Sequence, residues 1–275
     1  NSLAVDAQGR ILVSGTNGGV NKVLRYPTDG TAPTVFAGVP SLVVGNTVLE
    51  QKSGRILLAG RKTSGGSSGV VFAYQNTGAA EDITFGPNGS DGFYSTGINQ
   101  AIDDMIIDSN DDIYLVYRDT NLKLQKVSAD GSGLDPVFAS GVTIDTGIVA
   151  TNTAHIAMND AGNILVGSPV GANIQTRLYN GTSGAAISAV ETIADETPVL
   201  TQITGVADEF IASAYQTTGT AQMLTILVQS DGALDTVFAA GAGIAETAPQ
   251  AANQMNGISV QPDGRFLMIG RKTVS

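Results

Sequence analysis

Cysteine and tryptophan are both absent from the 275 residues of this chain. Without cysteine, thiol catalysis, cysteine-ligated zinc sites and disulfide bridges are all excluded. Without tryptophan, and with aromatic residues at only 5%, the usual stacking surface for carbohydrate is missing, which counts against a lectin. A single histidine, His155, would have to serve any Ser–His–Asp or histidine-ligated metal chemistry, and a structural histidine is the simpler interpretation.

Charged residues are scarce, at 14%, and the net charge is −11. An acidic protein without clustered Lys and Arg does not suit nucleic acid or anionic membrane surfaces. No apolar run reaches the roughly 18–20 residues that cross a bilayer, so we expect no membrane insertion. The cysteine-free composition fits an exported bacterial protein, and the chain opens at Asn1. We therefore expect a processed or partial chain that is extracellular or at the cell surface, with the periplasm as an alternative.

Glycine, by contrast, is abundant, with 34 residues. Many of them lie between short apolar runs, a pattern typical of all-β proteins. One unit recurs, consisting of an apolar strand, a turn with Asp or Gly, and a second apolar strand that ends near Gly. Its copies lie at 2–15, 47–60, 105–116, 156–167, 202–212 and 257–270, the fifth of them degenerate. Gly60-Arg61-Lys62-Thr63 even returns as Gly270-Arg271-Lys272-Thr273.

A second unit follows each of these hairpins: a strand, a turn of a polar residue and Gly, then often a tail with Phe. The glycines of this turn stand at 30, 78, 131, 181 and 232, which are 48, 53, 50 and 51 residues apart. Phenylalanine recurs in the tails at 36, 85, 138 and 238. We expect these rings to pack between repeats.

Each repeat therefore holds two hairpins, or about four short strands with alternating apolar faces. One such sheet cannot bury both faces alone, so copies stacked in a circle are favoured. We predict a single β-propeller domain of about fifty-residue blades, six in number with seven as the alternative, in an incomplete ring that is part of a longer chain. The blades would cover 1–45, 46–98, 99–150, 151–198, 199–252 and, partially, 253–275.

Two segments carry a resemblance to a known family. The run Gln261-Pro262-Asp263-Gly264-Arg265 between apolar strands at 258–270, and the segment 230–238, resemble the delta-60 repeat of bacterial β-propellers. Copies similar to it cover nearly the whole chain. The resemblance implies an exported bacterial propeller, often part of a large surface or secreted protein. It implies no particular reaction.

Polar residues recur just before the first strand of the repeats, where a propeller opens its central channel. When the repeats are aligned, the positions are occupied by Asn1, Asn46, Asp103, Asn256, by His155 beside Ala154, and by Thr201 or Gln202 in the shifted fifth copy. A ring of such side chains could bind a cation or a polar ligand. Alternatively, they cap strand ends and bind loop backbone.

A weak calcium-loop pattern starts at Asp108 and continues through Asn110 and Asp112. Ile113 stands where an EF-hand requires Gly, and no Glu closes the loop, so a hairpin turn is the favoured interpretation. We expect no cofactor, with calcium left open.

Regular repeats without a catalytic set favour a non-catalytic binding or scaffold propeller of an exported or cell-surface protein, whose partners would be proteins or neighbouring subunits. One alternative is a metal-dependent hydrolase, because the unit at 3–13 is similar to six-bladed lactonases of the gluconolactonase type. That family's Glu ligand has no counterpart here. A structural subunit of an extracellular fibre or layer is a further alternative.

Overall fold

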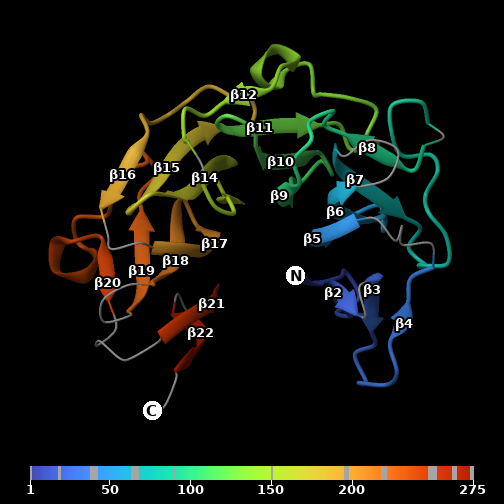
Figure 1. Ribbon diagram of the computed structural model, residues 1–275, viewed down its shortest axis with the longest axis horizontal. Coiled ribbons are helices and arrows are strands. Elements are labelled where there is room, and N and C mark those ends of the chain that lie inside the picture. Colours follow the sequence, from blue (N-terminus) through green and yellow to red (C-terminus); the bar gives the residue numbers. More distant parts are fainter. Residues whose placement is uncertain are drawn as a thin grey trace. The chain divides into compact units, whose positions relative to one another are not determined.

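A computed structural model describes residues 2–17, 20–37, 43–62, 68–89, 91–149, 151–194, 198–217, 222–246, 253–261 and 265–272. Within these ranges the chain is all-β, and its only helices are two short 3-10 segments, η1 (Phe138–Gly141) and η2 (Phe238–Gly241). None of the described helices is long and apolar enough to cross a membrane. The strands form antiparallel sheets, five of them four-stranded and one two-stranded (Figure 1).

The chain divides into two compact units. The first comprises Asn1–Asp119, Lys123–Pro136 and Gly141–Thr143, and the second comprises Thr120–Leu122, Val137–Ser140 and Ile144–Ser275. The sheets of the first unit contain β1 (Ser2–Val5), β2 (Ile11–Asn17), β3 (Val20–Tyr26) and β4 (Thr34–Val35), then β5 (Val43–Glu50), β6 (Ile56–Lys62), β7 (Ser68–Tyr74) and β8 (Phe93–Ser95). They are followed by β9 (Ile102–Ile107), β10 (Ile113–Arg118) and most of β11 (Leu122–Val127).

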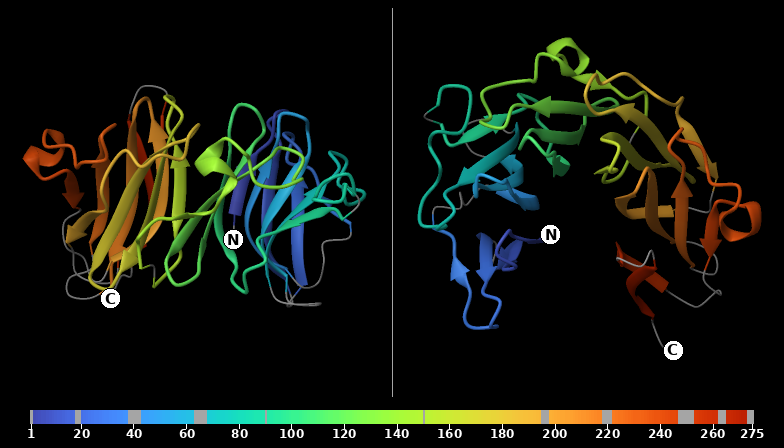
Figure 2. Two further views of the ribbon diagram at one scale, coloured as in Figure 1. Left: turned by 90° about the horizontal axis from the view of Figure 1, so that it is seen from above. Right: turned by 180° about the vertical axis from the view of Figure 1, so that it is seen from behind.

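The second unit contains β12 (Ile144–Asp145) and three further sheets. These are β13 (His155–Met158), β14 (Asn163–Val170), β15 (Asn173–Asn180) and β16 (Glu191–Ala194), then β17 (Pro198–Val206), β18 (Glu209–Gln216), β19 (Met223–Val228) and β20 (Ile244–Glu246), and finally β21 (Asn253–Val260) with β22 (Phe266–Lys272). The left view of Figure 2 shows the strands of β13–β20 running alongside one another in successive sheets. Two strands cross the expected repeat boundaries, because β5 begins at Val43 and β17 at Pro198.

The first hairpin turn of a sheet is built by one polar side chain. In the first sheet, Asp6 accepts hydrogen bonds from the main-chain N–H groups of Gln8 (3.0 Å) and Arg10 (2.9 Å). Asp108 does the same in the third sheet, and Asn159 accepts one such bond in the fourth. This local bonding, together with a positive φ at the fourth turn residue, explains why the Asp–Gly spacing predicts tight hairpins.

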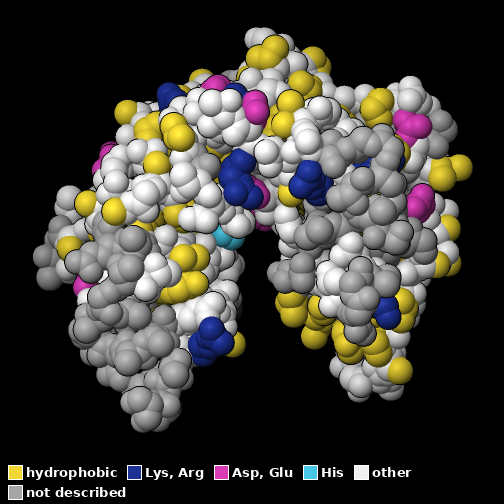
Figure 3. Space-filling model, in the orientation of Figure 1, with side chains coloured by type: hydrophobic (Ala, Val, Ile, Leu, Met, Phe, Trp, Pro, Cys, Tyr) yellow, Lys and Arg dark blue, Asp and Glu magenta, His cyan; other side chains and the backbone are white. Residues whose placement is uncertain are grey.

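In the first unit, β6 is buried on both faces. Ile56 and Leu58 pack into the cluster shared with the first sheet, while Leu57 and Ala59 pack into the cluster shared with the third. Consecutive residues of a strand point to opposite faces, so a continuous apolar run marks a strand with a sheet on either side. The first sheet differs: Leu3, Val5 and Ile11 are exposed, and Figure 3 shows hydrophobic side chains gathered over this sheet.

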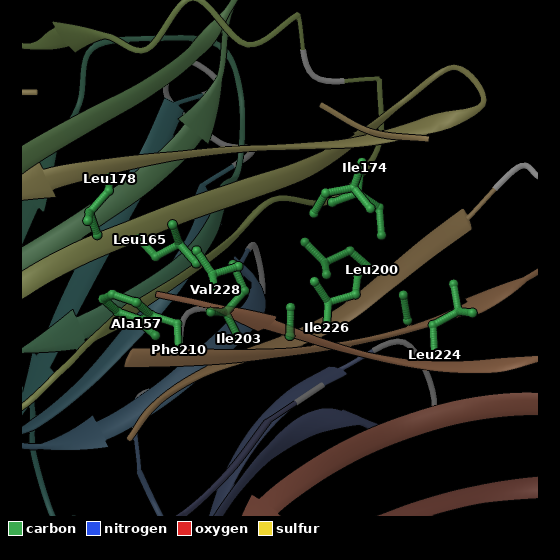
Figure 4. Close-up of a cluster of buried hydrophobic side chains, with 13 residues drawn as sticks. Ala157, Leu165, Ile174, Leu178, Leu200, Ile203, Phe210, Leu224, Ile226 and Val228 are labelled. Carbon is green, nitrogen blue, oxygen red and sulfur yellow. The ribbon is translucent and has the colours of Figure 1, made fainter. Parts of the chain in front are cut away.

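In the second unit, the fourth and fifth sheets bury one continuous core between them. Figure 4 shows Ala157, Leu165, Ile174 and Leu178 facing Leu200, Ile203, Phe210, Leu224, Ile226 and Val228. The repeat that is degenerate in sequence, the fifth, therefore forms a complete four-stranded sheet. The fifth repeat keeps the alternating apolar residues of the other repeats, even though its turn residues differ from theirs.

The recurring phenylalanines pack between successive repeats, as expected. Phe36 and Phe85 are buried against the second turn of the following sheet, at Gly78 and Gly131. Main-chain bonds accompany both contacts, from Ala37 N–H to the Gly78 carbonyl and from Gly86 N–H to the Asp130 carbonyl, each at 2.9 Å. In the first unit, successive sheets are thus joined by ring contacts and by backbone bonds.

Candidate functional site

The first strand of four sheets contains a β-bulge, and in each case the extra residue is polar. The register shifts pass over Asn46 in β5, Asp103 in β9, Thr201 in β17 and Asn256 in β21. A bulge leaves its extra residue outside the ladder and turns its side chain to a new direction. Bulges occur preferentially beside active sites, so these positions define the candidate site.

In the first unit, the strands that carry the bulges lie next to one another: β1 contacts β5, and β5 contacts β9. The amide of Asn46 donates to the Ile102 carbonyl (2.7 Å), directly before the bulge of the next sheet. The Thr47 hydroxyl donates to Asp104 Oδ1 (2.9 Å). These two bonds join the polar ends of β5 and β9.

Asp103 is buried and forms a bidentate ion pair with Arg118, at the end of β10. Arg118 Nε lies 2.7 Å from Oδ2, and its terminal nitrogen lies 2.9 Å from Oδ1. The guanidinium is partly exposed while the carboxylate is almost fully covered. Bidentate pairs of this kind are strong and fix orientation. Asp103, Asp104, Arg118, Asn46 and Thr47 therefore form one polar cluster, here called the bulge cluster.

In the second unit, the predicted residues lie on successive first strands. His155 begins β13, where it is half-buried and pairs with Gly167 of β14. Gln202 of β17 accepts a bond from Ile258 N–H (3.1 Å), and its amide donates to Thr204 (3.2 Å). Asn256 is exposed on β21. The bond from Ile258 links Gln202 to the neighbouring two-stranded sheet.

The structure thus brings Asn46 and Asp103 together in one unit and places His155, Gln202 and Asn256 in the other. Asn1 lies outside the described residues, as do 262–264 of the sixth hairpin turn. Sequence reasoning missed Thr47, Asp104 and Arg118. Arg118 could have been found by counting across the β9–β10 hairpin, in which Tyr117 pairs with Ile102. The bulge itself could not be predicted, because it does not alter the pattern of apolar residues in the sequence.

The three proposed calcium ligands lie at the β9–β10 turn, away from the bulges. Two of them, together with Asp135, surround the ammonium of Lys126, whose Nζ lies 3.4 Å from Asp108, 2.9 Å from Asp112 and 3.0 Å from Asp135. Burial alone lowers the pKa of Lys126, but the hydrogen bonds that its ammonium donates to Asp112 and Asp135 outweigh this effect and raise that pKa. A fixed ammonium thus lies among these carboxylates. Within the described residues, no group of three acidic or histidine side chains is arranged to hold a metal ion.

A small polar pocket of about 250 Å³ lies at the turn end of the second sheet, lined by Ser53, Gly54, Arg55, Gln75, Asn76 and Asp82. Arg55 Nε lies 2.7 Å from Asp82 Oδ2, and the guanidinium lies over the Phe85 ring. Burial raises the pKa of Asp82, but the hydrogen bonds from Thr84 and Arg55 outweigh it and lower that pKa. Since its charges are paired, this pocket serves the structure of the turn.

No family model matches the chain, and no curated protein matches it. Solved structures do. A protein of unknown function from Bacteroides caccae has 14% identity and a TM-score of 0.52, over 85% of this chain and 78% of that one. A putative exo-β-1,3-galactanase from Bifidobacterium bifidum has 11% identity and a TM-score of 0.47, over 90% of each chain. The exo-β-1,3-galactanase of Phanerochaete chrysosporium has 12% identity and a TM-score of 0.48, over 95% and 71%.

These similarities contradict the function expected from the sequence, a non-catalytic binding or scaffold protein with lactonase-like and fibre-forming alternatives. The similar structures with a stated activity include the two galactanases, whose names specify a carbohydrate substrate. The expectation relied on the regular repeats, on a missing catalytic set and on the family resemblance. Glycoside hydrolysis, however, requires chiefly carboxyl groups, and polar side chains bind sugar hydroxyls without tryptophan. Any such activity of this chain depends on the carboxyl and polar side chains of its own site.

Proposed function

We propose that the protein is a carbohydrate-active enzyme that hydrolyses a glycosidic bond, with the bulge cluster as its site. The observation that carries the proposal is the bulge at Asp103, which places two adjacent carboxylates beside Asn46 and Arg118 at the end of the first strands. The named galactanases supply the class of substrate, and these side chains supply the chemistry.

The cluster has the groups that recognise sugar hydroxyls. A hydroxyl both donates and accepts, so it is bound best where carboxylate oxygens lie beside N–H donors. Asp104, which is half-buried, supplies an acceptor, and Arg118 supplies donors on a partly exposed side chain. The ion pair and the bond from Thr47 hold both carboxylates in position before any substrate arrives, which lowers the cost of binding.

For hydrolysis, one carboxyl group must give a proton to the glycosidic oxygen while another faces the positive charge that develops on the sugar. Asp103, bound through both oxygens to Arg118, is suited to the second role. Asp104, whose Oδ1 accepts bonds from two neutral groups, the Thr47 hydroxyl and the Met105 N–H, is suited to the first. Its proton passes to the leaving oxygen as the C–O bond breaks. A water molecule then adds to the anomeric carbon and gives its proton to the carboxylate of Asp104, which restores the acid.

We also propose that the sheets are blades of a β-propeller, six in number with seven as the alternative, in an incomplete ring. Within each unit, support comes from first strands that adjoin first strands, β1 to β5 to β9 and β13 to β17 to β21. The repeated Phe–Gly contacts between successive sheets support it too. The delta-60 resemblance, the extracellular or cell-surface location, the protein partner and the lack of a cofactor stay predictions.

The test is a hydrolysis assay on β-1,3-galactan and on chromogenic aryl glycosides, with retention in polysaccharide-containing gels as a second readout. We expect Asp104→Asn to reduce turnover by at least about a hundredfold, since general acid catalysis contributes roughly that much, and to keep retention. Asp160→Asn, which changes an exposed carboxylate on the turn after β13, is the matched control. Neither turnover nor retention with any of these carbohydrates would refute the proposal.

A further inference from the structure

Arg61 and Arg118 occupy the same position in successive sheets. Each is the sixth residue of its strand, β6 in one case and β10 in the other. Each also directly follows the residue that pairs immediately before the bulge of the adjoining strand. The bulged residue is Asn46 beside β6 and Asp103 beside β10. The carboxylate that pairs with Arg118 is therefore replaced by an amide in the second sheet.

The Arg61 guanidinium lacks the ion pair that Arg118 has. Its Nη2 donates to Asn99 Oδ1 (2.7 Å), and its Nε is buried without a hydrogen-bond partner. Arg118 uses the same two nitrogens for both oxygens of Asp103. No described residue forms an ion pair with Arg61, and the residues of the first unit outside the described ranges include no Asp or Glu. The edge of Arg61 that suits a carboxylate is thus occupied at one nitrogen only, by a neutral amide.

Arg61 lies beside the bulge cluster. Side chains alternate along a strand, so Arg61 is on the face of β6 that packs against the third sheet. Its partner Asn99 lies three residues before Ile102, whose carbonyl accepts the bond from Asn46. The next residue is Asp103 of the cluster. One short segment that leads into β9 therefore contacts Arg61 at one end and contributes to the bulge cluster at the other.

We propose that Arg61 binds the carboxylate of an acidic sugar, so that the carbohydrate recognised by this protein contains uronic acid units. The inference rests on the proposed function and narrows its substrate class. One carboxylate oxygen accepts from Nε and the other from Nη2, as Asp103 does at Arg118. The Asn99 side chain, which is exposed, swings away to admit the sugar. A planar guanidinium edge selects a planar carboxylate by this bidentate pairing.

The charges of the site favour such a sugar. Arg118 matches the charge of Asp103, and Asp104 is the proton donor of the proposed reaction, so it is neutral when the substrate binds. Arg61 then leaves one positive charge without a counterpart among these four groups. Binding also gives the buried Nε an acceptor, which removes the cost of a buried donor without a partner.

The test compares β-1,3-galactan oligosaccharides with the same oligosaccharides partly oxidised at C6, which converts galactose units into galacturonic acid. Both forms are titrated into the full chain by calorimetry, and both are supplied in the hydrolysis assay. We expect the oxidised form to bind at least about tenfold more tightly, because a hydrogen-bonded charge pair contributes roughly that much.

Three variants locate the carboxylate. Arg61→Gln removes the charge and should abolish the preference for the oxidised form. Asn99→Asp should abolish it too, because it places a carboxylate on the same edge of Arg61 without a change in size. Lys62→Gln is the matched control, since it removes an equal charge one residue away, from a side chain that lies over the Phe93 ring. The preference should remain in that variant.

Equal binding of the two forms by the parent chain would overturn the inference. A preference that survives in Arg61→Gln would do so as well, and so would one that disappears equally in Lys62→Gln. Tighter binding of 6-O-sulfated galactan than of the oxidised form would also refute the carboxylate assignment. Failure of the proposed function gives a different result, because neither form is then retained or hydrolysed. Failure of this inference alone leaves the neutral galactan bound and hydrolysed.

Discussion

Gly78 lies so close to Phe36 that a Cβ atom on the glycine would come within 2.6 Å of the ring. The same relationship recurs one sheet later, where a Cβ on Gly131 would also lie 2.6 Å from the Phe85 ring. Both glycines have positive φ, 70° and 73°. Glycine is therefore required here twice, once by the backbone conformation and once by the ring of the preceding repeat.

Replacement of Gly131 by alanine separates these two requirements. Gly30 occupies the equivalent turn position in the first sheet, with φ 73°, and an added Cβ there meets nothing within 4 Å. We expect Gly30→Ala to cost about 1 kcal/mol for its backbone conformation alone. Gly131→Ala should cost roughly 1–3 kcal/mol more, because the Phe85 ring must move. Urea denaturation of the two variants measures the difference, and equal losses would show that the ring adapts freely.

The ammonium of Lys126 lies among three carboxylates, so the charge of this side chain should contribute to the stability of the protein. Lys126→Met should destabilise the protein by about 3–5 kcal/mol at neutral pH, since it leaves buried like charges together. The deficit should shrink as the pH falls toward about 4, where carboxyl groups ordinarily become protonated. Denaturation midpoints at several pH values test this. Lys52→Met, which changes an exposed lysine on the β5–β6 turn, is the control, and the same pH-independent loss in both variants would contradict the explanation.

Acid sensitivity follows from Asp6 and Asp82. Burial raises the pKa of Asp6, but hydrogen bonds from the Arg10 backbone and side chain outweigh it, so that pKa is lowered, as is that of Asp82. A carboxyl with a lowered pKa in the folded state stabilises the fold above its ordinary pKa of about 4 and loses that contribution as the pH falls further. We expect the free energy of unfolding to drop below pH 4, and the drop to be smaller in Asp82→Asn. An unchanged acid profile in that variant would show that other groups dominate.

Asp111 occupies, with φ 69°, a turn position that is glycine in the first, second and fourth sheets, at Gly9, Gly54 and Gly162. Its carboxylate accepts bonds from the main-chain N–H groups of Lys52 (2.6 Å) and Ser53 (3.0 Å) in the preceding sheet. Asp111→Ala should therefore destabilise the protein more than Asp111→Gly, because alanine keeps the strained φ and loses the bonds to Lys52 and Ser53. Asp111→Gly should recover about 1 kcal/mol of that loss. Thermal unfolding gives the order, and a glycine variant more stable than the parent would mean that the bonds contribute little.

Much of the fold could be predicted from the sequence because its causes are local. Alternation of apolar residues predicts strands, and the Asp–Gly spacing predicts hairpins whose bonds span only two to four residues, as at Asp6. The polar positions Asn46, Asp103 and Asn256 were found by alignment of the repeats, and each coincides with a bulge. Their bulged geometry was not predicted, because a bulge changes the register of a strand without changing its composition.

The repeat, the all-β class, and the phenylalanines and glycines between sheets follow from the sequence alone, since all of these depend on period, residue size and backbone freedom. The contact of Thr47 with Asp104 and the position of Lys126 among three carboxylates depend instead on the tertiary structure. Those contacts join residues that are separated in the sequence and are brought together by folding, so no local pattern of residues predicts them.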